Sequence, residues 1–250
     1  MLTFYSTLRE LLIPDQVQYE LQPVPEALYP LVKSAFGLQI NAFSSIPVLL
    51  LPDPSAYLTW TKMAEGSHRC KLVGPRSVAL RIDRRRRTKT CLIRLNPGAV
   101  QRILGIPANE LCDQSISMAE TWLSDFERVD SSEDPWRILE NITPGEGITR
   151  PQMLVDAFCR KAPEQATVRS IARDLGVSDR YLRKQVLRHI GLSPKKVQRI
   201  ARMFGALHLR TEYEHWRWAE LAAAAGYVDQ SHMIAEFQEL LGASPTAVFS

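Results

Sequence analysis

The sequence predicts an α+β fold in which an N-terminal mixed or barrel-like β domain with helices precedes an all-α domain. Short strand-like runs separated by Pro and Gly occupy the first part of the 250 residues, and the last hundred residues contain one motif twice. A stretch rich in polar residues, Pro and Gly lies between them. We expect residues 1–135 to form the first domain, 136–150 a linker and 151–250 the helical domain.

The first domain is predicted from its strand-like runs. Residues 46–51, 77–82 and 90–95 are rich in aliphatic residues and are bounded by Pro, Gly or polar residues, a pattern typical of strands and hairpins. Helices are expected over 97–104 and through Trp122, Phe126 and Val129.

The densest basic run of the chain covers Arg84 to Arg87 together with Lys89. Two interpretations are open. Clustered guanidinium groups release counterions when they bind DNA, so the run could contact phosphates. The other interpretation is a solvated hairpin tip between strands that end at Ile82 and begin at Thr90.

The last hundred residues carry one motif at 171–197 and again at 221–248, aligned with one extra residue at Val228. In each copy a short apolar helix, a glycine and a small or polar residue precede a second helix. This is the helix-turn-helix pattern. Ala172 and Ala222 are expected where the helices of each motif pack closely, and Gly176 and Gly226 where the chain turns. Ser178 and Asp229 are expected to cap the second helix of each motif. Gly191 and Gly242 are expected to end these helices, with Pro194 and Pro245 just beyond as helix stops.

Residues 193–211 carry apolar side chains at a mostly helical spacing, which predicts one long linker helix between the two motifs. The two motifs, the linker helix, the G-x-S-P endings and the string GYVDQSH at 226–232 resemble the DNA-binding domain of the AraC/XylS family of transcription regulators. The resemblance covers about 151–250 and places the motifs at about 167–190 and 217–241. It implies a sequence-specific regulator whose partners are double-stranded DNA and RNA polymerase.

The two motifs differ in charge. From 167 to 202, ten Lys or Arg stand against two Asp, a net charge of +8, whereas from 203 to 250 two Arg stand against six Asp or Glu, a net charge of −4. The basic residues that the family often carries in its second motif are missing from residues 233–239, which read MIAEFQE. Since Lys and Arg supply most of the sequence-independent affinity for DNA, the first motif is expected to dominate binding.

The second helix of each motif is expected to lie in the major groove and to read bases with its exposed face. In the first motif Leu182, Val186 and Ile190 turn inward at spacings of four, so that the basic residues face outward. Arg183 and Lys184 match positions through which members of the family touch bases. The predicted DNA-binding residues are Arg180, Arg183, Lys184 and Arg188, then Lys195 and Lys196 as phosphate contacts, and Gln230, Ser231, Ile234 and Ala235 in the second motif.

Residues 93–111, IRLNPGAVQRILGIPANEL, with Gly74 and Pro75 before them, are similar to the N-terminal domain of one group of AraC-like regulators. In such regulators this domain senses a signal or mediates self-association. The resemblance therefore implies an unidentified small-molecule effector, or a homodimer formed through this domain.

Sequence patterns of catalysis, such as a Walker A loop, a G-x-S-x-G elbow or an H-E-x-x-H pair, are missing, so no enzyme activity or cofactor is expected. The four cysteines form no C-x-x-C pair, which favours reduced thiols over zinc or disulfides and leaves redox sensing as the alternative. No metal is expected, although His208, Glu212 and His215 share a helical stripe. No apolar run approaches the ~20 residues of a membrane span, and Arg9 and Glu10 interrupt the N-terminal apolar stretch. We expect a soluble, cytoplasmic protein.

Two classes of function fit the sequence. The first is a sequence-specific transcription regulator whose N-terminal domain responds to a signal or a partner. The second is a protein-interaction module that retains the double helix-turn-helix fold with weak or no specific DNA binding, which the acidic second half allows.

Overall fold

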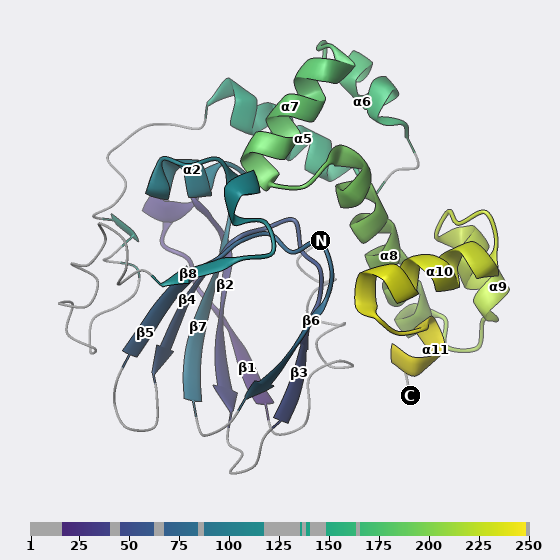
Figure 1. Cartoon of the computed structure of the whole chain (residues 1–250), viewed down its shortest axis with the longest axis horizontal. Coiled ribbons are helices and arrows are strands. Elements are labelled where there is room, and N and C mark those ends of the chain that lie inside the picture. Colours follow the sequence, from purple (N-terminus) through teal and green to yellow (C-terminus); the bar gives the residue numbers. More distant parts are fainter. Residues whose placement is uncertain are drawn as a thin grey trace.

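The structure is a computed structural model, and it describes residues 17–40, 46–62, 68–84, 88–117, 136, 139–140, 149–163 and 166–248. A β domain forms the N-terminal part of the chain, and the C-terminal part is helical (Figure 1). The predicted α+β fold, with a β domain before an all-α domain, is confirmed.

The N-terminal domain is built on a six-stranded sheet with the strand order β1-β2-β7-β4-β5-β8. Every neighbouring pair is antiparallel, and Phe36 of β2 lies opposite Leu92 of β7. The order leaves β1 and β8 at the two edges. The strands are β1 (Val17–Gln22), β2 (Val32–Ile40), β4 (Tyr57–Lys62), β5 (His68–Val73), β7 (Thr88–Leu95) and β8 (Ser115–Ser117).

A second, two-stranded antiparallel sheet is formed by β3 (Ile46–Leu50) and β6 (Leu80–Arg84). The hairpin predicted around the basic run is therefore wrong. β6 pairs with β3, whereas β7 pairs with β2 and β4, so the connection from β6 to β7 joins two different sheets. Residues 85–87 lie outside the described residues, and a phosphate contact by this run stays a prediction.

Three short helical segments pack on the sheet and close its core. They are η1 (Glu26–Leu28), α2 (Ala99–Leu104) and η2 (Ala108–Leu111). Leu28, Ile103 and Leu111 are buried in one cluster with Leu72 and Ile93 from the strands. The helix predicted over 97–104 is confirmed as α2, whereas the helix predicted through Trp122, Phe126 and Val129 lies outside the described residues.

Seven helices form the described part of the C-terminal domain. Their core includes Phe158, Leu182, Met203 and Phe237, each at most 1% exposed. None of the helices among the described residues has the length and apolar character needed to cross a membrane. The helices are α5 (Arg150–Lys161), α6 (Val168–Asp174), α7 (Asp179–Ile190), α8 (Pro194–Glu212), α9 (Trp218–Ala224), α10 (Gln230–Leu241) and α11 (Pro245–Val248).

Pro194 and Pro245 differ from their predicted role as helix stops. Each is instead the first residue of the next helix, α8 or α11, where the missing N–H of proline leaves no hydrogen bond unmade. The long helix predicted between the motifs is confirmed as α8, which connects the α6–α7 unit to the α9–α10 unit (Figure 1).

The β domain and the helices are in direct contact. The amide of Ala79, in the N-terminal domain, donates to the carbonyl of Leu240 in α10 at 2.7 Å. Leu51, Ala79 and Cys112 of the N-terminal domain pack against the helical core. The residues between 117 and 149 are mostly outside the described ranges, so the predicted domain and linker boundaries stay predictions.

Candidate nucleic-acid interface

The two helix-turn-helix motifs fold with the same turn. A glycine in the left-handed region makes each turn, with φ of 67° at Gly176 and 81° at Gly226. The next amide donates to an alanine carbonyl, that of Ala172 at 3.0 Å in the first motif and that of Ala222 at 2.9 Å in the second. Both alanines are buried, which confirms the predicted positions of close packing.

We call α7 and α10 the reading helices, because each is the second helix of its motif. Side-chain oxygens cap both at the predicted residues: Ser178 Oγ accepts from the Tyr181 amide at 3.2 Å, and Asp229 Oδ1 accepts from the His232 amide at 2.7 Å. Gly191 and Gly242 end these helices in the left-handed conformation, as predicted. The bounds of both reading helices therefore follow from local sequence.

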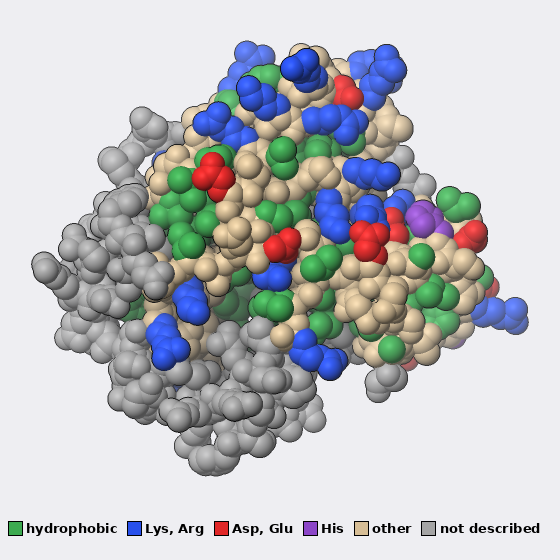
Figure 2. All heavy atoms as spheres, viewed as in Figure 1, with side chains coloured by type: hydrophobic (Ala, Val, Ile, Leu, Met, Phe, Trp, Pro, Cys, Tyr) green, Lys and Arg blue, Asp and Glu red, His purple; other side chains and the backbone are tan. Residues whose placement is uncertain are grey.

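The first reading helix separates an apolar face from a basic one. Leu182, Val186 and Ile190 are buried in the helical core, as predicted from their spacing. Figure 2 shows Lys and Arg side chains gathered over the part of the surface formed by α6 and α7. The exposed face of α7 carries the predicted DNA-binding residues Arg180, Arg183 and Lys184.

These three cations make only weak contacts with other described residues. Arg183 Nε lies 3.0 Å from Asp179 Oδ1, one turn earlier on the same helix, and both side chains are at least one-third exposed. Exposed pairs of this kind contribute about 0.3–0.5 kcal/mol, so a stronger anion can replace the aspartate. Arg180 and Lys184 form no ion pair with another described residue. All three are accessible to a polyanion.

Arg188 lies at the other end of α7, against the N-terminal domain. Its Nε donates to Gln101 Oε1 of α2 at 3.1 Å. Next to it, the Gly98 amide donates to the carbonyl of His189 at 3.0 Å. Partial burial and the nearby Arg188 lower the pKa of His189, which favours the neutral imidazole. Arg188 is exposed, and its predicted DNA contact stays a prediction alongside this contact with α2.

Gly191 allows this close approach. A Cβ on Gly191 would lie 2.7 Å from the Ala108 carbonyl oxygen of η2 and 2.6 Å from Pro75 Cγ. The C-terminal end of the first reading helix is thus seated on η2 and α2. Its basic N-terminal part points away from this contact (Figure 1).

The second reading helix presents a surface without charge at the matching positions. Gln230, Ser231, Ile234 and Ala235 are exposed, as predicted. Amide and hydroxyl groups can hydrogen-bond to base edges or phosphates, and the two apolar side chains can contact a thymine methyl. These four side chains can make hydrogen bonds and apolar contacts, but they carry no positive charge that would attract a polyanion.

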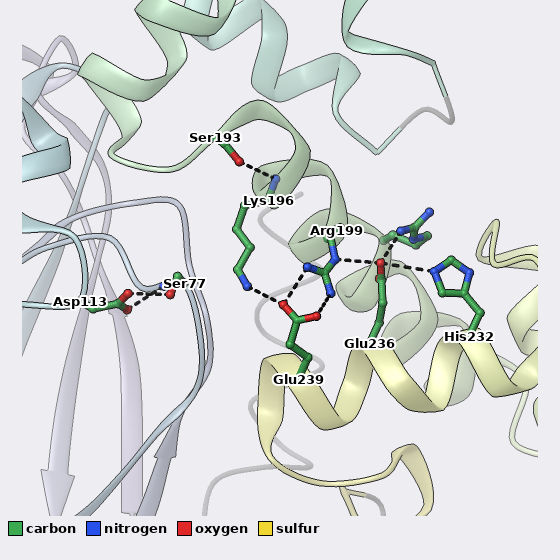
Figure 3. Close-up of polar contacts among 9 residues, drawn as sticks. Ser77, Asp113, Ser193, Lys196, Arg199, His232, Glu236 and Glu239 are labelled. Atoms are coloured by element: carbon green, nitrogen blue, oxygen red, sulfur yellow. Dashed lines mark hydrogen bonds and ion pairs between the residues drawn. The ribbon is translucent and has the colours of Figure 1, made fainter.

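The acidic residues of α10 bond to α8, which is the main feature that sequence reasoning missed. Glu236 Oε1 accepts from Arg199 Nε at 2.9 Å and from Arg202 Nη2 at 2.6 Å (Figure 3). Glu239 Oε1 accepts from Arg199 Nη1 at 2.8 Å and from Lys196 Nζ at 3.3 Å. Five side chains on two helices thus form one ion network, which we call the α8–α10 network.

The α8–α10 network changes how the charges of the domain are distributed. Three of the ten cations counted between 167 and 202 are paired with Glu236 and Glu239. The difference in unpaired charge between the two motifs is therefore smaller than the difference in net charge counted from the sequence. Lys196, predicted as a phosphate contact, is 18% exposed and bonded to Glu239, whereas Lys195 is exposed and forms no ion pair with another described residue. Phosphate binding by both lysines stays a prediction.

The network also changes the pKa of Glu239, the more exposed of its two glutamates. A hydrogen bond from Arg199 lowers the pKa of Glu239 to about 2, partial burial opposes this shift, and a hydrogen bond from Lys196 lowers the pKa to a lesser extent. Glu239 is therefore ionised at every pH at which DNA binding is measured. A signal for the network exists in the sequence: Lys196, Arg199 and Arg202 recur every three residues on α8, as do Glu236 and Glu239 on α10.

Among the described residues, no group of three or more His, Cys, Asp or Glu is placed to hold a metal ion. The cysteines are free thiols. Burial raises the pKa of Cys70 to about 12 and those of Cys112 and Cys159 to about 11. Because the thiolate is the reactive form, these values disfavour a redox-sensing role for the three thiols.

Comparisons with known proteins agree with this architecture. A family model described as a helix-turn-helix domain matches residues 171–250, and one described as a domain of unknown function matches residues 19–117. No curated protein matches the chain at a significant level.

Several solved structures are similar to parts or most of the chain. The C-terminal domain of AraT, a response regulator from Geobacillus stearothermophilus, is 23% identical, with 40% of this chain and 86% of that chain covered and a TM-score of 0.35. A DNA-binding transcriptional dual regulator from Escherichia coli K-12 is also 23% identical, with 42% and 93% covered and a TM-score of 0.34. ToxT from Vibrio cholerae O395 is 10% identical, with 94% and 98% covered and a TM-score of 0.44.

The family model, together with the paired motifs joined by α8 and their matching turns and caps, identifies residues 171–250 as a helix-turn-helix domain. With this domain the protein is a DNA-binding transcription regulator, and its paired motifs agree with the resemblance to the AraC/XylS family.

Proposed function

We propose that the protein regulates transcription by binding a specific DNA sequence chiefly through its first helix-turn-helix motif. The observation that carries this proposal is the difference between the exposed faces of the reading helices. The face of α7 carries Arg180, Arg183 and Lys184, whereas that of α10 carries no charge at the matching positions. Cations on the exposed face attract the DNA backbone and can also hydrogen-bond to bases.

In this proposal the N-terminal part of α7 enters the major groove. Arg183 reads a base, because a guanidinium can donate two hydrogen bonds to the O6 and N7 atoms of guanine. Lys195, exposed at the start of α8, contacts the phosphate backbone and sets the position of the domain without sequence preference. The second reading helix contributes weaker contacts through Gln230 and Ser231.

The experiment that tests this function is a selection of duplexes from a random pool by the full chain, followed by a titration of selected and unselected DNA. Specific regulators bind their own sites roughly 10³ to 10⁷ times more tightly than random DNA. Enrichment of one sequence with a difference of this order supports the proposal. Equal binding of selected and random DNA at physiological salt contradicts it.

Arg183→Ala is expected to cost about 1–3 kcal/mol at one base pair of the selected site and to relax the preference there, because a bidentate contact to that base is lost. Fluorescence anisotropy with duplexes changed at single positions measures this. Lys195→Ala is the control, since loss of a phosphate contact weakens all sequences about equally. An Arg183→Ala variant with unchanged affinity and preference would mean that this side chain does not read bases.

The alternative function, a protein-interaction module with weak or no specific DNA binding, draws support from the second motif. The absence of cations at the matching positions of α10 and the pairing of three cations with Glu236 and Glu239 both reduce its attraction for DNA. If selection with the full chain enriches no sequence, this alternative is the better account.

We also propose that the N-terminal domain mediates self-association or senses a small-molecule effector, and that the DNA-bound protein contacts RNA polymerase. Strand β1 lies at an edge of the six-stranded sheet and exposes Leu21 to 61%. Unpaired edges of this kind can add a strand from a second copy. Light scattering of the full chain at high micromolar concentration is expected to show a dimer, and a strict monomer would count against self-association.

A further inference from the structure

Lys196 and Arg199 hold the carboxylate of Glu239 from two sides (Figure 3). Arg199 Nη1 donates to Oε1 at 2.8 Å, Arg199 Nη2 contacts Oε2, and Lys196 Nζ lies 3.3 Å from Oε1. Two N–H donors of one guanidinium that face two oxygens form the fork with which Arg binds phosphate as well as carboxylate. The ammonium beside them adds a point charge suited to the same ligands.

The guanidinium is held in place from behind by a second glutamate. Arg199 Nε donates to Glu236 Oε1 at 2.9 Å, and the Glu236 side chain is only 6% exposed. Arg202 Nη2 holds the same oxygen at 2.6 Å. Glu236 therefore sets the direction of the Arg199 fork, and the two Nη atoms remain for an outer ligand. Glu239, which fills that position, is 52% exposed.

The outer ligand position lies beside the face of α10 that is predicted to meet DNA. Ser231, Ala235 and Glu239 follow one another at intervals of four, so they share a stripe of the helix. Lys195, exposed at the start of α8, adjoins Lys196. A DNA strand that runs along the exposed face of α10 would thus reach the carboxylate of Glu239 and the fork behind it.

We propose that Lys196 and Arg199 form a binding site for a phosphate of the DNA backbone, and that Glu239 occupies this site as an internal anion when DNA is absent. On DNA binding a phosphate takes the place of the carboxylate, which turns into solvent. The inference rests on the proposed function, because it concerns the same DNA complex. It accounts for an acidic residue at the edge of a reading helix, since Glu239 competes with DNA for two cations.

Glu239→Gln removes the charge of the competing anion and keeps the shape of the side chain. Because the phosphate contacts Lys196 and Arg199 in both complexes, the slope of log affinity against log salt concentration should change little, and only the competition from the carboxylate is lost. The affinity for random duplex DNA should rise on the order of tenfold at ~0.1 M salt. Anisotropy titrations of the full-length wild type and variant at several salt concentrations measure both quantities.

Two controls separate this site from a general effect of charge. Glu212→Gln makes the same change in net charge on an exposed residue at the far end of α8, and it should leave the affinity for random duplex DNA nearly unchanged. Lys196→Ala should remove about 0.9 of the salt slope in both the wild type and the Glu239→Gln background, because the phosphate contacts Lys196 in either complex. Circular dichroism and thermal unfolding confirm that each variant is folded.

The outcomes distinguish this inference from the proposed function. Binding of selected DNA by the wild type tests the function, whereas the difference between Glu239→Gln and Glu212→Gln tests the phosphate site. Equal affinities of these two variants for random duplex DNA, with the wild type still binding its selected DNA, would overturn the site and leave the function intact. An absence of DNA binding by every variant would overturn both.

Discussion

Replacement of Arg180, Arg183 and Lys184 together by alanine is expected to abolish specific DNA binding. These residues are the cations on the exposed face of α7, and each either contacts a base or neutralises a phosphate in the proposed complex. The loss of Arg180 and Lys184 should also lower the salt slope, by about 0.9 for each phosphate contact that they make. Fluorescence anisotropy with the selected duplex at one fixed salt concentration measures the loss.

The matched control for this variant changes the same number of charges elsewhere. Lys62, Arg69 and Lys71 are exposed on β4 and β5 of the N-terminal sheet, and their joint replacement by alanine should leave specific binding nearly unchanged. Both triple variants alter exposed side chains only, so circular dichroism should show an intact fold. Similar losses in the two variants would mean that total charge, and not the face of α7, determines binding.

Gly191→Ala is expected to destabilise the protein much more than Gly242→Ala, although both glycines end a reading helix in the left-handed conformation. Both changes incur the cost of placing a Cβ at positive φ, about 1–2 kcal/mol. At Gly191 the new Cβ would also lie 2.7 Å from the Ala108 carbonyl oxygen, whereas at Gly242 no heavy atom lies within 4 Å. The overlap should add on the order of 1–3 kcal/mol.

Urea unfolding of the two variants measures the difference. Because η2 is part of the N-terminal domain, the extra loss at Gly191 reports the contact between that domain and the first reading helix. Equal losses in the free energy of unfolding at the two glycines would show that the packing of α7 against η2 and α2 does not contribute to stability. A change in the slope of the denaturant dependence would show that the two domains unfold separately.

Local signals explain why the helical domain could be predicted in detail. Gly176 and Gly226 adopt positive φ, Ser178 and Asp229 supply cap oxygens, and the buried apolar residues of α7 recur at intervals of four. Each of these features depends on a few consecutive residues, so the repeat located the turns, the reading helices and their exposed faces without knowledge of the packing.

Contacts between distant residues explain what the sequence could not predict. Arg199 and Glu236 are 37 positions apart, and only the packing of α10 on α8 turns two separate charge patterns into one ion network. The contact of Arg188 with Gln101 depends in the same way on how α7 is seated on α2. The hairpin predicted at Arg84 to Arg87 was wrong because strand pairing is also non-local, and β6 pairs with β3 instead of β7.

The most direct test of the central claim compares the two reading helices in one titration. The Arg180, Arg183 and Lys184 triple alanine variant and a Gln230 and Ser231 double alanine variant are measured by fluorescence anisotropy on the same selected duplex at one salt concentration, with folding checked by circular dichroism. Dominance of the first motif predicts that the triple variant loses specific binding, while the double variant loses less than about tenfold in affinity, roughly 1.4 kcal/mol. Equal losses in the two variants would contradict it, because both helices would then read DNA to the same extent.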